Sequence, residues 1–153
     1  MAERIRNAKT RADLASLSPS IPRNNAGAVE WEKAIENALL ANRIRFRYVC
    51  IFHDEARINR VSKHLINPKI TKYFVGYFPS EKKIVPMPNF LLVDGDEVVV
   101  IFPYTYGEPE VWLSIKHPDV VKTFERYFQR LWDDSIKITR KDIESGLMKS
   151  IRN

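Results

Sequence analysis

The sequence lacks the features that define several common classes of protein. Its single cysteine, Cys50, cannot form an internal disulfide, and its three histidines fall in separate predicted elements, so we expect a reducing cytoplasm, no metal and no cofactor. The longest apolar stretches, such as Val98–Pro103, are far shorter than the ~20 residues of a membrane-spanning helix. Met1–Arg6 is too charged for a signal peptide. These absences favour a globular protein that does not bind membranes.

The composition is that of one globular domain. The chain has 153 residues, 44% of them hydrophobic and 11% aromatic, which excludes disorder as its main state. We expect a single domain over residues 1–134. A C-terminal tail, residues 135–153, follows it, with a short helix that begins after Thr139.

The positive charge is unevenly distributed along the chain. The net charge is +6, and residues 1–70 hold 13 Lys and Arg against 7 Asp and Glu, whereas residues 71–153 hold 12 of each kind. The first half is therefore a candidate surface for a polyanion such as nucleic acid. A generally basic, solvated surface is the alternative interpretation.

The hydrophobic periodicity predicts alternating strands and helices, followed by hairpins. The expected helices are 29–41, 55–65 and 118–132, and the expected strands are 13–18, 43–52, 72–78, 88–93, 97–102 and 110–115. In the last helix, positions 120, 124, 127, 128 and 131 form the stripe expected to pack on the sheet, with Val121 at its margin. This order predicts an α/β fold, a mixed β-sheet with a parallel centre flanked by helices.

Two segments carry a family resemblance. The first is PMPNFLLVDGD, residues 86–96, which leads into a predicted hairpin. The second is residues 111–133, an aromatic strand followed by a His-Pro-Asp turn and a helix rich in Phe and Trp. Over residues 11–133 the chain resembles a phospholipase D-like half-domain, in particular the sensor domains of prokaryotic transcriptional regulators.

The family's catalytic motif is incomplete in this sequence. In active members it consists of a His nucleophile, a Lys two residues later that binds phosphate, and an Asp five residues after the Lys that orients the His. Asp94 matches the Asp position, but Asn89 stands at the Lys position and Met87 at the His position. Because a thioether cannot attack phosphorus, the resemblance implies a catalytically silent domain with a regulatory or ligand-sensing role.

Polar residues near the ends of the predicted strands are candidates for a ligand pocket. Ser18 and Ser20 follow the first strand, His53 follows the second, and Asn89 lies near the start of the strand that leads to the hairpin. Ligands of open α/β sheets bind beyond the carboxyl ends of the strands. The alternatives are a loop histidine beside a helix cap for His53, and a simple turn residue for Asp94.

Three arginines alternate along the second predicted strand. Arg43, Arg45 and Arg47 would share one face, where they either bind phosphates or form a solvated edge. Phe46 and Tyr48 point to the other face, so no stacking platform for single-stranded nucleic acid is predicted.

Three hypotheses about function stay open. The first is a regulatory or ligand-sensing domain that works beside a DNA-binding regulator. The second is a small phosphodiesterase or nuclease that uses His53, and the third is a basic module that binds nucleic acid weakly through residues 1–70. Active relatives join two half-domains about a two-fold axis, so we expect a homodimer around Lys83–Asn89. A monomer in which the tail covers this surface is the alternative.

Overall fold

A computed structural model of the protein describes residues 1–18, 26–79, 88–102 and 111–146. These residues form a seven-stranded sheet with the order β6-β5-β4-β1-β2-β3-β7. The pairs β1–β2 and β2–β3 are parallel, and the remaining pairs are antiparallel. The strands are β1 (Arg11–Ser16), β2 (Arg45–Ile51), β3 (Tyr73–Phe78), β4 (Asn89–Val93), β5 (Glu97–Phe102), β6 (Val111–Ile115) and β7 (Ile136–Ile138).

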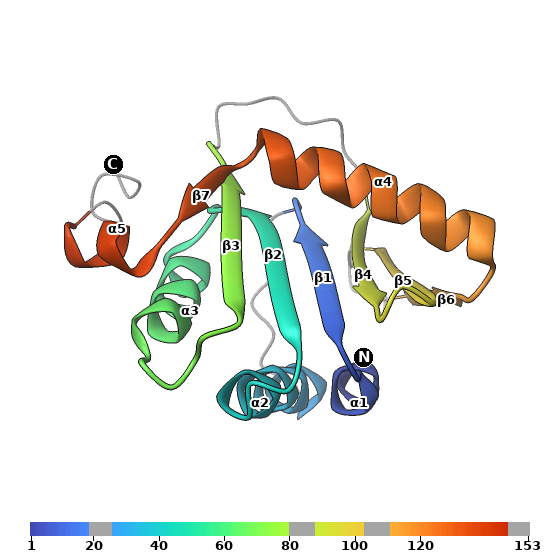
Figure 1. Ribbon diagram of the computed structural model, residues 1–153, viewed down its shortest axis with the longest axis horizontal. Helices are drawn as coiled ribbons and strands as arrows, with labels where there is room; N and C mark the ends of the chain where they lie inside the picture. The colour runs from blue at the N-terminus through green and yellow to red at the C-terminus, as the bar shows by residue number, and fades with distance from the viewer. Residues whose placement is uncertain (19–25, 80–87, 103–110, 147–153) are drawn as a thin grey trace.

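Helices cover both faces of the sheet. α4 (Pro118–Asp134) lies on one face, and α1 (Ala2–Asn7), α2 (Ala26–Leu40) and α3 (Glu55–Ile66) lie on the other (Figure 1). The short α5 (Arg140–Glu144) follows β7. Among the described residues, no helix combines the length and the hydropathy that crossing a membrane requires.

Alternation along the strands builds two hydrophobic cores. In β4, Phe90 packs against α4, whereas its neighbour Leu91 packs on the opposite face of the sheet, and both are completely buried. Phe90 meets the Phe128 ring of α4 edge to face, with ring centroids 6.3 Å apart. Burial of each such side chain contributes about 1.5–3 kcal/mol, so the sheet is anchored on both sides.

The predicted mixed sheet with a parallel centre is confirmed, and the element boundaries differ by a few residues. The strand β7 was not predicted, because three residues are too few to show a period. It pairs antiparallel with β3 inside the segment expected to be a tail. Gly76 permits this approach, since a Cβ there would lie 2.1 Å from the Ser135 hydroxyl oxygen.

The buried side of α4 is rotated from the predicted stripe. Val121, expected at the margin, is 2% exposed, and Phe128 and Leu131 are buried beside it. Val120, Phe124 and Tyr127 pack only partly against the sheet. The prediction of an apolar face is therefore right, but its centre is displaced.

A buried ion pair lies under α4. The Arg47 guanidinium donates from Nε to Asp13 Oδ1 at 2.7 Å and from Nη2 to Asp13 Oδ2 at 2.9 Å. Its Nη1 donates to Gln129 of α4, and its carbon Cζ lies 4.8 Å from the centroid of the Phe128 ring and 5.4 Å from that of Trp132. Arg47 is thus paired and covered by aromatic rings rather than being the exposed strand arginine that the sequence suggested.

We predict that Arg47→Met destabilises the fold by about 3–5 kcal/mol, because it leaves the Asp13 carboxylate buried without its partner. Arg45→Met is the matched control, since Arg45 lies two residues earlier on the same strand with an exposed side chain. Its effect is expected within about 0.5 kcal/mol. Urea unfolding of both variants measures the difference, and equal effects would contradict a structural role for the pair.

Candidate functional site

Asn89 fastens the end of β1 to the start of β4. Its side-chain oxygen Oδ1 accepts hydrogen bonds from the backbone N–H groups of Leu17 at 2.9 Å and Ser18 at 3.2 Å. Its Nδ2 donates to the Ser18 hydroxyl at 2.7 Å. Both ends of this amide are therefore occupied by the chain itself.

His53 and Arg57 reach the same strand ends from the opposite side. His53 follows β2, and its ring nitrogen Nε2 lies 3.2 Å from the carbonyl oxygen of Leu17. Arg57 of α3 is 4% exposed and points under the helix toward the sheet. Its guanidinium donates at 2.6–3.2 Å to three backbone carbonyls at the ends of β1 and β2, those of Ser16, Ser18 and Ile51.

Three of the four predicted pocket residues therefore meet at one edge of the sheet: Ser18, His53 and Asn89. Ser20, like Met87, lies outside the described residues. Arg57 was missed as a site residue, although an arginine three positions after the helix cap Asp54, where a capping box has Glu, was a local signal. The cluster holds the strand ends together through hydrogen bonds to backbone N–H groups and backbone carbonyls.

Asp94 lies at the other end of β4, away from this cluster. Its carboxylate accepts hydrogen bonds from the backbone N–H groups of Lys9, Thr10 and Arg11 at 2.8–3.0 Å, and from the Thr10 hydroxyl at 3.0 Å. Asp94 and Gly95 have φ angles of 54° and 83°, so they form the tight turn of the hairpin. Partial burial raises the pKa of Asp94, but the hydrogen bonds outweigh it and lower the pKa below its ordinary value.

The resemblance gave the motif aspartate the role of orienting the histidine. In this chain Asp94 binds only the backbone and the hydroxyl that precede and begin β1. About 3.3 Å of rise per residue places the Asp94 end of β4 about 16 Å from its Asn89 end. Asp94 is therefore a structural residue of the turn.

The three strand arginines do not form one exposed face. Arg43 precedes β2 and donates from Nη2 to the carbonyl of Ile5 in α1 at 2.9 Å. Arg45 is exposed, whereas Arg47 lies in the ion pair beneath α4. The predicted phosphate-binding row is therefore reduced to one free arginine, Arg45, among the described residues.

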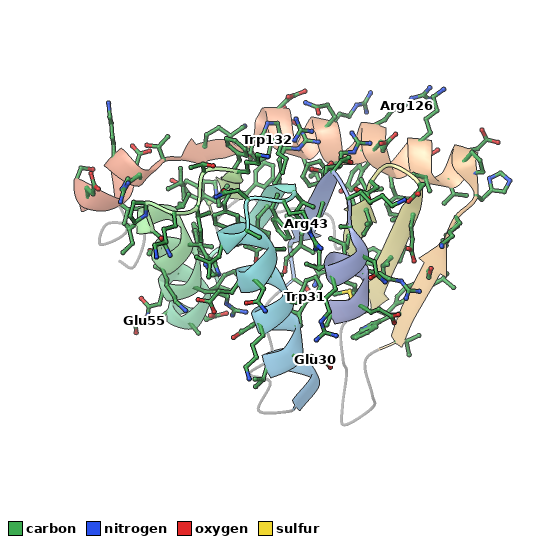
Figure 2. The ribbon with its side chains drawn as sticks, turned by 60° about the horizontal axis from the view of Figure 1, so that its bottom comes forward. Glu30, Trp31, Arg43, Glu55, Arg126 and Trp132 are labelled. Atoms are coloured by element: carbon green, nitrogen blue, oxygen red, sulfur yellow. The ribbon has the colours of Figure 1, made fainter. Side chains whose placement is uncertain are left out.

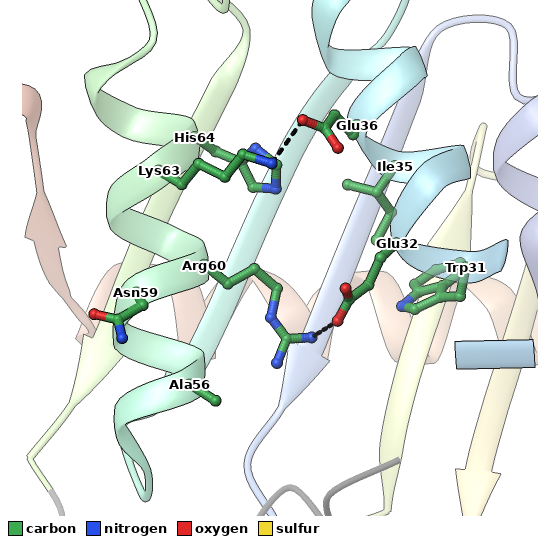
Figure 3. A pocket seen from close by; sticks show the side chains of 9 residues that line it. All are labelled: Trp31, Glu32, Ile35, Glu36, Ala56, Asn59, Arg60, Lys63 and His64. Atoms are coloured by element: carbon green, nitrogen blue, oxygen red, sulfur yellow. Dashed lines mark hydrogen bonds and ion pairs between the residues drawn. The ribbon is translucent and has the colours of Figure 1, made fainter. Parts of the chain in front are cut away.

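A cleft of about 380 Å³ lies between α2 and α3 on the other side of the molecule (Figure 3). Two ion pairs cross it, Arg60–Glu32 at 2.7 Å and Lys63–Glu36 at 2.8 Å. At its inner side His64 is buried, which lowers its pKa. The cleft differs from the dry pocket expected of a ligand sensor, because charged side chains line much of it.

Chemically reactive groups are few in the described part of the chain. Burial raises the pKa of the Cys50 thiol to about 12, which leaves it protonated and unreactive at neutral pH. Across residues 1–18, 26–79, 88–102 and 111–146, no three His, Cys, Asp or Glu side chains gather in a way that could hold a metal ion.

Comparisons with known proteins identify the fold. No family model and no curated protein matches the chain. Among solved structures it is similar to Nuc, a phospholipase D family member from Salmonella typhimurium, with a TM-score of 0.66 and 19% identity over 90% of this chain and 88% of Nuc. NucT from Helicobacter pylori gives a TM-score of 0.57 and 12% identity over 90% of this chain and 87% of NucT.

A third similar structure is TrmBL2, an archaeal chromatin protein with a novel mode of DNA binding. The TM-score is 0.62 and the identity 18%, over 90% of this chain but only 48% of TrmBL2. The chain thus spans about half of TrmBL2 and most of Nuc and NucT. Together these likenesses show that the chain has the phospholipase D-like fold, as the sequence resemblance implied.

We predict that Asp94→Asn destabilises the protein at pH 7 by about 1 kcal/mol, because the amide can accept fewer of the four hydrogen bonds. The pKa of Asp94 is lowered by folding, so its stabilisation is present above the unfolded value of about 3.9 and is lost as the pH falls through the folded value.

Unfolding free energies of wild type and Asp94→Asn should therefore converge as the pH falls below about 4. Asp96→Asn, in the same turn with an exposed side chain, is the control and should show little difference at any pH. A gap between wild type and Asp94→Asn that stays constant from pH 7 to pH 3 would contradict the role given to this carboxylate.

Proposed function

We propose that the protein is a non-catalytic phospholipase D-like domain with a regulatory or ligand-sensing role. The observation that carries the proposal is the state of Asn89. This residue stands where active relatives have lysine, and its amide is occupied by three hydrogen bonds to Leu17 and Ser18. A neutral amide used in this way supplies no charge to a phosphate.

An enzyme built on His53 has less support. Nucleophilic histidine needs a partner that orients the ring and a cation that receives the phosphate. Among the described residues, the His53 ring has the Leu17 carbonyl as its hydrogen-bond partner. The nearby Arg57 guanidinium is bound to three carbonyls. The retained motif residue, Asp94, is at the far end of β4.

A regulatory role is supported by the similarity to TrmBL2. The matched region is about half of that DNA-binding chromatin protein, so the rest of TrmBL2 lies outside the shared fold. By analogy, we propose that this domain works beside a DNA-binding regulator. The α2–α3 cleft, whose volume of about 380 Å³ is in the range of ligand pockets, would suit a polar or charged effector, because two ion pairs cross it.

We expect no hydrolysis of bis(p-nitrophenyl) phosphate or plasmid DNA above a buffer control, with or without divalent metal ions. Wild type, His53→Ala and Asn89→Asp should give the same background rate, because none of them carries the motif His and Lys. Robust turnover by wild type that disappears in His53→Ala would overturn the proposal and favour the phosphodiesterase.

The homodimer is proposed on the same analogy, with Lys83–Asn89 at its two-fold axis. Of this segment only Pro88 and Asn89 belong to the described residues. Light scattering at micromolar concentration should give twice the chain mass of 17.9 kDa. A mass of one chain, both for the full protein and after truncation at Gly146, would contradict the dimer.

A further inference from the structure

Most arginines of the basic first half already have partners within the protein. Long-range ion pairs or backbone carbonyls hold the side chains that gave residues 1–70 their charge. The pairs are Arg4–Glu97, Arg6–Glu30, Arg11–Glu125, Arg47–Asp13, Arg60–Glu32 and Lys63–Glu36, and Arg57 binds three carbonyls. Two of the acidic partners, Glu97 and Glu125, come from the second half. The cations available to a partner must therefore be found from the structure and not from the sequence halves.

Three cations that are available to a partner form a row on the outer side of α4. Lys122, Arg126 and Arg130 are exposed and stand four residues apart, so they share one face with a rise of about 6 Å between neighbours. Figure 2 shows Arg126 on the side of α4 that points away from the sheet. We call these three residues the α4 cationic row. Within the described part of the chain, no carboxylate forms an ion pair with any of them.

The acidic residues of α4 lie inside its contact with the sheet or beside the two ends of this row. Between Asp119 and Asp133 the helix has one acidic residue, Glu125, and that residue pairs with Arg11 of β1. The remaining carboxylates lie at the two ends of the helix. The three cations therefore occupy the middle of the outer face, with Asp119 one turn before Lys122 and Asp133 and Asp134 one turn after Arg130.

The row is also held in place before any partner arrives. The inner side of α4 is fixed to the sheet by the buried Val121 and Phe128 and by the hydrogen bond between Gln129 and Arg47. Binding then costs side-chain entropy but no folding of the helix. A straight row of cations on a fixed helix matches a linear array of phosphates better than it matches a single anion.

We propose that the α4 cationic row binds the phosphate backbone of double-stranded nucleic acid without sequence preference. Lys and Arg neutralise phosphates and release counterions, which gives affinity that depends on salt. An anionic membrane is the less suitable partner. The exposed positions beside the row include the polar Thr123 and the acidic Asp119 and Asp133, and an interfacial helix needs apolar side chains that enter the bilayer.

The test compares two triple variants that remove the same charge. Lys122→Gln/Arg126→Gln/Arg130→Gln removes the row, and Lys33→Gln/Lys69→Gln/Lys72→Gln removes three exposed cations on α2 and between α3 and β3. Glutamine is a good helix former, so both proteins should keep the far-UV circular dichroism and melting temperature of wild type. Fluorescence anisotropy with a labelled 20-base-pair duplex, from 50 to 200 mM salt, gives the affinity and its salt dependence.

We expect wild type to bind in the non-specific range, with Kd of about 10⁻⁴–10⁻⁶ M at physiological salt. Loss of the row should weaken binding at 50 mM salt by about tenfold or more, and lower the slope of log K against log salt by about 2.7, because three phosphate contacts are lost. The control triple variant should bind like wild type. Lysine at positions 126 and 130 should retain most of the affinity.

Three results would overturn the proposal: no binding of the duplex by wild type at 50 mM salt, equal weakening in both triple variants, or row-dependent binding to phosphatidylserine vesicles but not to DNA. The second result would mean that only the overall charge matters. None of these outcomes depends on catalysis, so the proposal stands or falls separately from the absence of hydrolysis.

Discussion

The fold depends on the way β4 holds both ends of β1. β1 is the strand at which the sheet changes from parallel to antiparallel pairing, with β2 on one side and β4 on the other. At one end Asn89 accepts the N–H groups of residues 17 and 18, and at the other Asp94 accepts those of residues 9, 10 and 11. Two side chains, one at each end of β4, thus accept hydrogen bonds from five backbone N–H groups at the two ends of β1. These hydrogen bonds fix the register of the junction between β1 and β4.

This arrangement gives two of the motif positions a role in holding the sheet together. At the Asp position, Asp94 stabilises the hairpin turn. A residue there must adopt a positive φ and accept several hydrogen bonds, and aspartate can do both. At the position that the resemblance aligns with Lys, Asn89 makes comparable hydrogen bonds at the opposite end of β4. Restoring lysine at position 89 would remove the acceptor for two backbone N–H groups. The present sequence is therefore adapted to holding the strands together at the edge where ligands of such sheets bind.

The sequence predicted most of the elements and the convergence of strand ends, but it missed the long-range ion pairs. The hairpin, the parallel strands and the α3 cap at Asp54 each rest on neighbouring residues, and the rule that strand carboxyl ends converge was enough to bring Ser18, His53 and Asn89 together. The charge asymmetry does not say which cations are unpaired, because some of them pair across 93 residues in Arg4–Glu97 and 114 in Arg11–Glu125. Such pairs follow from the packing of distant elements, which no window of the sequence contains.

The rotation of α4 shows how those long-range pairs decide what the surface presents. By hydrophobic period alone, Val120 and Phe124 belong to the centre of the buried face and Val121 to its margin. The structure instead centres that face on Val121 and Phe128, in line with Glu125. The polar pairs Arg11–Glu125 and Arg47–Gln129 account for this rotation of α4. Arg11 of β1 and Arg47 of β2 lie beneath the helix, and positions 125 and 129 of α4 are the ones that contact them. The same rotation leaves the face that carries Lys122, Arg126 and Arg130 exposed to solvent. Charged side chains on β1 and β2 therefore determine which face of α4, a helix much later in the chain, is exposed to solvent.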